Sequence, residues 1–467
     1  MLTYFPRYFS TRAIICYVVT LALVSVIFMS HALPFQFILF GFVAVVIFFT
    51  YVTKLTMKWQ FLSEGEFVKK LFVTALLIRV LYVFFIYFYY IEMTGKPNAY
   101  FAGDEEYYEY MGTLWRDYGF RETVDLMRSY ADLSDRGYAW WLSFECLILG
   151  THVLPFRLVK CLIDAFSCVL IYKLAKRNFG ESTGRMAAVF CLLMPNMWYY
   201  CGVTLKEIEM AFMVILFVER ADFALRSPKI TFGNIILPAI VILVMFSFRT
   251  AMAAVMMAAF AGAMILSPEK QLQAWKKVLY SAVFVLWMFL TVGAEMIQET
   301  QEMWAARTEN QTVGYQSRAE NMNGNTLAKY ASASVFAPLI FTIPFSSMVA
   351  TPTQENQMMM NGANFVKNIM SGFTILALLL LLIRGDWRKH VLPIAVMCGY
   401  LVVLVFSNFA HSERFHFPVL ALELMFAAYG VSQVTNKHKR WYTIWLLGIC
   451  IANIAWAWIK LAGRGMA

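Results

Sequence analysis

The sequence has few charged residues. Only 15% of its 467 residues are Asp, Glu, Lys or Arg, whereas 60% are hydrophobic, and soluble domains average roughly 25% charged. This scarcity excludes an ordinary soluble enzyme and a disordered chain, and it is typical of a protein that crosses a membrane several times. The net charge of +10 does not predict nucleic-acid binding, because membrane proteins concentrate lysine and arginine in their cytoplasmic connections.

Metal and redox motifs are also missing. The eight cysteines include no Cys-x-x-Cys pair, and most lie inside apolar runs, where a cysteine is usually a small buried hydrophobic residue. The first apolar run follows Arg7 and Arg12 and lacks a small-residue cleavage site, so we expect it to stay in the membrane. No internal repeat is visible, which counts against a transporter built from duplicated halves.

Long apolar runs recur along the whole chain. Each approaches the roughly 20 residues that a helix needs to cross the hydrocarbon core, and none alternates as a barrel strand does. Because every backbone amide in lipid must be paired internally, the runs predict an all-α polytopic membrane protein with about thirteen transmembrane helices. The predicted spans are 13–30, 35–53, 71–91, 155–175, 184–203, 208–225, 232–248, 250–267, 277–295, 368–383, 391–407, 415–433 and 441–460.

Every second connection between these spans is rich in lysine and arginine, which places it in the cytoplasm and the N-terminus inside. This alternation requires that the short apolar stretch 138–150 does not cross the membrane. We interpret it as a helix lying in the membrane interface, with a re-entrant segment as the alternative. Two of the remaining, outer connections, 92–154 and 296–367, are long, and long loops in a compact protein are usually functional.

The strongest local feature is the run Gly-Asp-Glu-Glu-Tyr-Tyr at 103–108, in the first long outer connection. Adjacent carboxylates repel one another, so one of them can be held protonated or poised as a base. A solvated start of a helix is the alternative interpretation, because carboxylates stabilise the N-terminal end of the helix dipole.

A second group of charged residues lies at the predicted outer ends of helices, where the positive-inside rule does not account for it. Charges near lipid are costly and tend to face a polar cavity, and lysines and arginines gathered there would suit a phosphate. Each one taken alone is better explained as an interfacial anchor, whereas the set taken together favours an anionic pocket. The group comprises Arg157, Lys160, Lys206, Glu207, Arg249, His411, Glu413, Arg414 and His416.

Asp104-Glu105 with Tyr108 resembles the Asp-Glu-x-x-Tyr element in the first outer loop of GT-C glycosyltransferases, in particular the protein mannosyltransferases and the bacterial lipid A aminoarabinose transferases. Further similar segments follow in the family's order: Arg157 with Leu-Ala-Lys-Arg-Asn-Phe-Gly at 174–180, Pro195 with Lys206-Glu207, and Glu-Arg-Phe-His-Phe-Pro at 413–418 with Ala-Ala-Tyr-Gly at 427–430. The resemblance covers roughly 98–260 and 411–430.

The chain departs from these relatives in two ways: two extra spans precede the helix that carries the first outer loop, and no large soluble domain follows the last span. We therefore divide the sequence into four parts. They are two extra N-terminal helices at 1–70, a GT-C-like core at 71–295 with its first outer loop at 92–154, a second outer loop at 296–367, and C-terminal transmembrane helices at 368–467.

The resemblance implies an enzyme that moves a sugar from a polyprenyl-phosphate-linked donor to a glycan, lipid or protein acceptor of the cell envelope. Asp104 would accept the proton of the acceptor hydroxyl, and Glu105 is the second catalytic candidate. The residues that the resemblance assigns to the donor phosphate are Arg414, Lys206, Arg249, Arg157 and His411. Those assigned to other substrate contacts are Tyr108, Glu106, Glu207 and Glu413. Some GT-C enzymes use a divalent metal near the loop acids and others do not, so no cofactor is assigned.

Other functions fit parts of the sequence. A polysaccharide repeat-unit polymerase or ligase would use lipid diphosphate donors, and a lipid-oligosaccharide flippase or transporter would need charges near mid-membrane. Only Arg79, Asp164 and Glu423 lie that deep, so an enzyme is preferred; a structural subunit with a degenerate site is disfavoured by the intact carboxylates. We expect a multi-pass protein of the bacterial inner membrane with its active site on the extracytoplasmic side.

Overall fold

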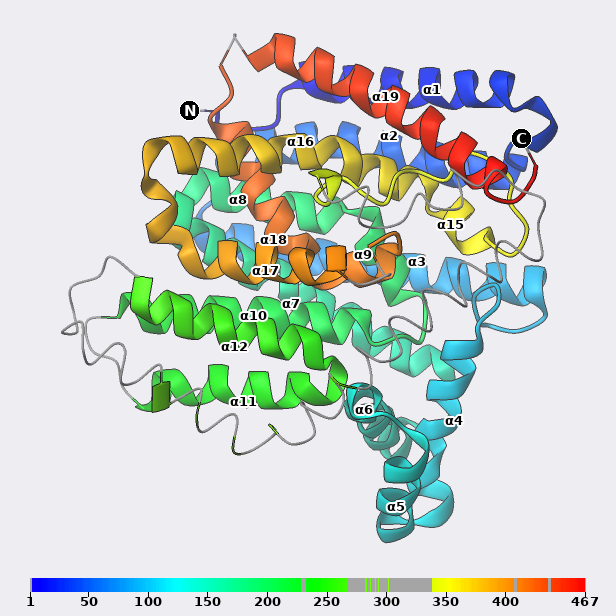
Figure 1. The fold of residues 1–467 in the computed structure, drawn as a ribbon, viewed down its shortest axis with the longest axis vertical. Helices are drawn as coiled ribbons and strands as arrows, with labels where there is room; N and C mark the ends of the chain where they lie inside the picture. Colours follow the sequence, from blue (N-terminus) through cyan, green and yellow to red (C-terminus); the bar gives the residue numbers. More distant parts are fainter. Residues whose placement is uncertain are drawn as a thin grey trace.

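The computed structural model describes residues 2–227, 232–266, 338–406, 410–435 and 438–466, together with isolated positions between 282 and 301. These residues form α-helices and short 3-10 turns (Figure 1), with one isolated β-bridge between Ala32 and Val349. The predicted all-α class is confirmed. The helices are α1 Arg7–Ile27, α2 Phe35–Trp59, α3 Glu64–Thr94, α4 Gly103–Tyr118, α5 Phe120–Tyr130, α6 Leu133–Leu149, α7 Val153–Phe179, α8 Glu181–Leu193, α9 Pro195–Cys201, α10 Glu207–Arg226, α11 Phe232–Phe248, α12 Thr250–Leu266, α15 Glu355–Met359, α16 Asn361–Arg384, α17 Val391–Phe406, α18 Glu413–Ser432 and α19 His438–Ala462.

Seven of the described helical segments are long and apolar enough to cross a membrane: α1, α2, α3, α16, α18, α19 and Asp386–Phe406, which contains α17. The predicted span 184–203 is divided into α8 and α9, because the proline at 195 disfavours a helical conformation for the residue before it. The predicted span 277–295 falls mostly outside the described residues. The structure therefore supports a multi-pass membrane protein, and the number of thirteen spans stays a prediction.

Helix α18 is the centre of the bundle. In its most apolar window 89% of the residues are buried, compared with 28% in α1. It packs against α8, α10, α16 and α17, and Figure 1 shows it between α16 on one side and α10 on the other. The contact with α16 is close at Gly430, where an added Cβ would come within 2.1 Å of the Phe373 carbonyl oxygen. Helices α1, α2 and α19 cover this core on the far side of α16.

A buried ion pair joins α3 to α7. The guanidinium of Arg79 pairs with the carboxylate of Asp164, and both side chains are almost fully buried. Arg79 also donates to the carbonyl oxygens of Cys191 (3.3 Å) and Leu192 (3.4 Å) on α8. A charge inside a membrane protein is tolerated when it is paired and hydrogen-bonded in this way, so this pair fixes three helices against one another.

Ion pairs also join the helix ends that carry the predicted cytoplasmic connections. Arg177 at the end of α7 contacts Glu219 (2.5 Å) and Asp222 (3.2 Å) on α10. Lys176 contacts Glu64 at the start of α3 at 2.6 Å. Three connections that the sequence assigns to one side of the membrane therefore meet at one end of the bundle.

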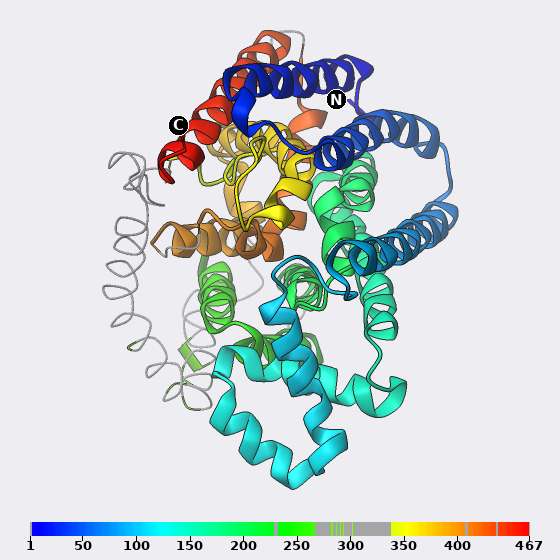
Figure 2. The ribbon, with the colours of Figure 1, turned by 90° about the vertical axis from the view of Figure 1, so that its right-hand side faces the viewer.

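At the opposite end, α4, α5 and α6 leave the bundle and form an arm of residues 103–149 (Figures 1 and 2). The arm has its own small hydrophobic core, which is separate from the main one. Its buried members are Met111, Leu114, Met127, Ala131 and Ala139. The apolar stretch 138–150, predicted to be a helix, lies in α6 up to Leu149 and ends at its C-cap Gly150. The second long outer connection, 296–367, is described at position 301 and from 338 onward, and it contains α15 and the start of α16.

Candidate active site

Arg414 connects the arm to the membrane helices. It lies in the first turn of α18, and its guanidinium forms ion pairs with Asp104 in the first turn of α4 and with Glu207, the first residue of α10. The Asp104 side chain is 67% exposed, that of Arg414 is 21% exposed, and that of Glu207 is fully buried. The arginine therefore has one carboxylate partner that is open to solvent and one that is enclosed in the protein.

Lys206 holds the base of the arm. Its buried ammonium donates hydrogen bonds to the Asp135 carboxylate and to the carbonyl oxygens of Ser134 (2.6 Å) and Phe248 (2.8 Å). The Tyr108 hydroxyl donates to the same carboxylate at 2.6 Å. An ammonium has three N–H groups, and in this arrangement all three have acceptors within the protein. Lys206 and Tyr108 thus both hold Asp135, and the predicted contacts of Lys206 with phosphate and of Tyr108 with substrate stay predictions.

Burial and charge pairing shift the pKa values of Lys206 and Asp135 in opposite directions. Burial lowers the pKa of Lys206 to about 8, although the neighbouring Asp135 carboxylate pulls that pKa upward. Burial raises the pKa of Asp135, but the Lys206 ammonium and the Tyr108 hydroxyl outweigh this, and the pKa lies below its usual value. The pair is ionised at neutral pH, and Lys206 loses its proton only slightly above it.

Glu105 points away from solvent, into the protein. One of its carboxylate oxygens accepts from the Arg157 guanidinium (3.2 Å) and from the Thr204 amide (2.8 Å), and the other accepts from the Ala99 amide (3.1 Å). Arg157 also donates to the Pro97 carbonyl oxygen at 2.7 Å and is fully buried. Glu105 and Arg157 therefore hold the segment before α4 in place, and their predicted catalytic and phosphate-binding roles stay predictions.

The three neighbouring carboxylates at 104–106 do not converge. Asp104 pairs with Arg414, Glu105 with Arg157, and Glu106 with the exposed Lys96 at 2.7 Å. Within the described residues no group of three His, Cys, Asp or Glu side chains is placed to hold a metal ion. A hard cation needs several oxygen ligands around one point, so the arrangement of these three carboxylates does not fit a metal ion.

The other predicted site residues, Arg249, Glu413 and His411, contact different parts of the protein. Arg249, between α11 and α12, lies 4.3 Å over the Phe415 ring and donates to the Tyr400 hydroxyl at 3.1 Å. Glu413 accepts a hydrogen bond from Asn196 at 2.5 Å. The His411 ring packs against Trp456 of α19, with 5.4 Å between ring centroids. Arg249 thus lies beside Phe415, the residue that follows Arg414, and we call Asp104, Glu207, Arg249 and Arg414 the Arg414 cluster. His411 faces the C-terminal helix.

Two functional neighbours were missed by sequence reasoning. Asp135 is one of two aspartates in a short polar stretch, and Tyr400 is one aromatic residue of an apolar span. Neither belongs to a motif, and each gains its role only by contact with a residue far along the chain: Asp135 with Lys206, and Tyr400 with Arg249. The arrangement as a whole offers an exposed carboxylate, Asp104, beside the Arg414 guanidinium, which suits proton abstraction next to a bound phosphate.

Two family models match separate parts of the chain. Residues 137–294 match the dolichyl-phosphate-mannose-protein mannosyltransferases, and residues 356–462 match the Alg9-like mannosyltransferase family. Both are GT-C families. Together the two matches support a GT-C fold membrane glycosyltransferase. The two matches together include the α6–α12 region and the C-terminal helices that carry Arg414, so the cation cluster of this glycosyltransferase is formed by both.

One solved structure similar to this glycosyltransferase is the archaeal oligosaccharyltransferase AglB from Archaeoglobus fulgidus, in complex with an inhibitory peptide and a dolichol-phosphate. The identity is 13% and the TM-score 0.40, with 85% of this chain covered. The chain spans 56% of the length of that protein. No curated protein matches the chain.

The position of Lys206 predicts a pH dependence. Sugar transfer should fall as the pH rises through about 8, because the neutral amine has only two N–H groups and cannot hold all three of its present acceptors. In Lys206→Arg the side chain stays charged, so this decline should be absent from the pH–rate profile. Lys96→Arg, at an exposed lysine of the same end, should keep the wild-type profile. An unchanged decline in Lys206→Arg would assign the titration to another group.

Proposed function

We propose that this glycosyltransferase transfers a sugar from a polyprenyl-phosphate-linked donor to an acceptor on the extracytoplasmic side of the membrane. The observation that carries the proposal is the position of Arg414 between an exposed carboxylate, Asp104, and a buried one, Glu207. A cation held in this way at the outer end of a central helix is a natural partner for the phosphate of a lipid-linked donor.

Donor binding would rearrange this ion-pair chain. The donor phosphate would replace Asp104 on Arg414, because Asp104 is exposed and can move into solvent, whereas Glu207 is enclosed and stays. Arg249 lies on the same cluster and would share the phosphate charge. Binding of the donor thus releases the Asp104 carboxylate next to the sugar, where it can act as a base.

The reaction would then proceed by displacement at the anomeric carbon. The acceptor oxygen forms a bond to that carbon while its proton passes to Asp104, and the bond from the carbon to the phosphate oxygen breaks. The polyprenyl phosphate leaves with the electron pair, and Arg414 and Arg249 stabilise the charge that develops on it. Lys206 with Asp135, and Arg157 with Glu105, hold the arm so that Asp104 stays within reach.

The test of this function is transfer by the purified protein in lipid nanodiscs. Synthetic polyprenyl-phosphate sugars are supplied with mixed glycan acceptors, and release of polyprenyl phosphate is followed by mass spectrometry. We expect release that depends on the sugar donor and is lost in Arg414→Ala. Release from polyprenyl-diphosphate donors alone would favour a polymerase or ligase instead. Movement of the intact donor between leaflets without release would favour a flippase.

The proposed side of the membrane is tested by cysteine labelling. In a cysteine-free background, Lys96→Cys and Tyr118→Cys should react with an impermeant thiol reagent in intact cells, because both positions are exposed at the end of the bundle that carries the arm. Lys389→Cys, exposed at the other end, should react only after the membrane is permeabilised. Reaction of Lys389→Cys in intact cells would reverse the orientation.

A further inference from the structure

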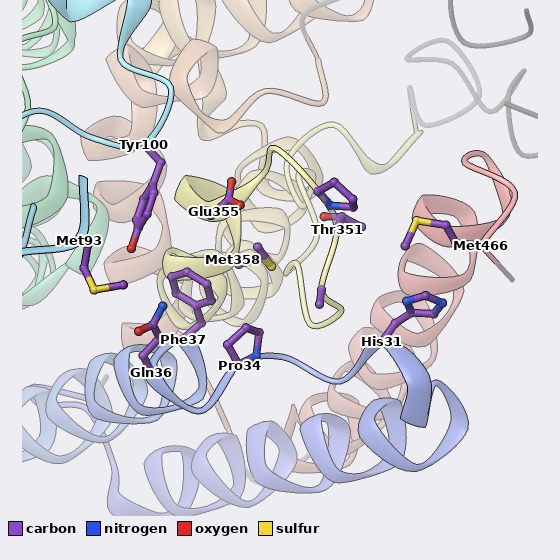
Figure 3. Close-up of a pocket in the computed structure, with 12 residues that line it drawn as sticks. His31, Pro34, Gln36, Phe37, Met93, Tyr100, Thr351, Glu355, Met358 and Met466 are labelled. Atoms are coloured by element: carbon purple, nitrogen blue, oxygen red, sulfur yellow. The ribbon is translucent and has the colours of Figure 1, made fainter. Parts of the chain in front are cut away.

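A cavity lies beside the start of α2 and α15, and none of its lining residues belongs to the ion pairs of Arg414 (Figure 3). Its volume is about 430 Å³, within the range typical of small-ligand sites. Four parts of the chain line it: the turn between α1 and α2, the end of α3 with the segment after it, the segment 350–358, and the C-terminus. Its lining includes the side chains of His31, Gln36, Phe37, Tyr100, Glu355 and Met358.

The charge of this cavity differs from that of the Arg414 cluster. Its lining contains no lysine or arginine, and its acidic residue is Glu355. One oxygen of the Glu355 carboxylate is buried and accepts no hydrogen bond from the described residues. A buried acceptor left without a donor is costly, so the site favours a ligand that brings N–H or O–H groups and disfavours a phosphate or carboxylate.

Backbone strain is concentrated beside the same cavity. Among the described residues, two that are not glycine have φ in the left-handed region: Phe101 at 52° and Thr353 at 60°. Phe101 follows Tyr100, and Thr353 lies two residues before Glu355. Such conformations cost free energy in residues with a Cβ and cluster at ligand sites, which is an indication of a binding site independent of the cavity itself.

The cavity is connected to the Arg414 cluster through the segment before α4. The side-chain amide of Asn356, next to Glu355, donates to the Tyr100 carbonyl oxygen at 2.6 Å. Tyr100 lies four residues before Asp104 on the same segment. Most of the lining lies outside the two regions, 137–294 and 356–462, that match the mannosyltransferase families.

We propose that this cavity is an acceptor subsite that binds an uncharged carbohydrate. The ring of Tyr100 offers an apolar face for a sugar ring, His31 and Gln36 offer polar contacts, and the Glu355 oxygen without a donor among the described residues accepts from a sugar hydroxyl. This subsite rests on the proposed function for its role as acceptor site, but its ligand chemistry follows from the cavity alone and is tested separately.

The test uses the full-length protein in nanodiscs free of sugar detergents, with a photoreactive octyl glucoside as a neutral probe and a photoreactive octyl phosphate as an anionic one. The glucoside should label the peptide that contains 350–358. Labelling should fall about tenfold in Glu355→Gln, because a hydrogen bond to a charged group is lost, and also in the cavity-filling variant Ala350→Phe. Glu122→Gln, at an exposed carboxylate of α5, should label as the wild type does.

Stronger labelling of 350–358 by the octyl phosphate, or equal labelling of wild type and both cavity variants by the glucoside, would overturn the subsite. Preferential labelling there by a photoreactive alkane would also overturn it, since the cavity would then hold a lipid tail. Donor turnover is measured on the same preparations. Glucoside labelling without any donor turnover would contradict the proposed function and support the carbohydrate site. Donor turnover without glucoside labelling would support the proposed function and contradict the carbohydrate site.

Discussion

Replacement of Asp104 by asparagine is expected to lower sugar transfer by about 10²-fold or more, because the variant keeps the shape of the side chain and loses the base. Donor affinity should stay the same or increase, since the carboxylate that competes with the phosphate for Arg414 is removed. Steady-state transfer and direct binding of a fluorescent polyprenyl-phosphate sugar would measure the two effects separately.

Asp117→Asn is the matched control for this variant. Asp117 is an exposed aspartate on the same helix, α4, and the structure gives it no contact with the Arg414 cluster. It should transfer sugar at the wild-type rate. If Asp104→Asn also transfers sugar normally, Asp104 is not the base, and its ion pair with Arg414 serves only to position the arm.

Loss of Arg414 should weaken donor binding and the stabilisation of the leaving phosphate, and not proton abstraction. In Arg414→Ala we expect donor affinity and transfer to fall by about 10²-fold to 10³-fold, the usual effect of removing a charged group that stabilises a developing negative charge in an enclosed site. Arg414→Lys should recover only part of this loss, because an ammonium cannot form the bidentate contact of a guanidinium with phosphate. Binding of the labelled donor, followed at several salt concentrations, measures the effect.

Removal of Arg414 also leaves the buried Glu207 carboxylate without its cation, so a folding defect must be separated from a binding defect. Arg414→Ala with Glu207→Gln removes both charges and should fold as well as the wild type while binding donor no better than Arg414→Ala. Arg121→Ala, at an exposed arginine of α5, is the control for the loss of a positive charge. Normal donor binding by the double variant would reduce Arg414 to a structural ion-pair partner.

The helices could be predicted because hydrophobicity in a membrane protein is a local property of the sequence. Each predicted span in the described residues contains a helix, and the resemblance to GT-C enzymes is supported by both family models. What hydrophobicity could not show is how the helices pack. The central position of α18 depends on close contacts such as Gly430 against α16, and these are set by the shapes of two distant segments.

The candidate site was only partly predictable for a related reason. The acidic run at 103–108 and the outer arginines stand out by charge, and the structure brings Asp104, Glu207 and Arg414 together. Their individual roles depend on burial, however. Glu105 is adjacent to Asp104 in the sequence, yet it turns inward to Arg157, because successive helical residues point about 100° apart. No pattern in a single sequence separates the exposed carboxylate from the buried one.

The buried pair of Arg79 and Asp164 bears on how the chain is made. The partners are 85 residues apart, so at a synthesis rate of about 5–20 residues per second Arg79 is made about 4–17 s before Asp164. Until then α3 enters the bilayer with an unpaired arginine, at a cost of about 2.5–3.5 kcal/mol for a position at the helix centre. The apolar residues around Arg79 must offset this cost alone until α7 docks onto α3 and supplies the carboxylate of Asp164.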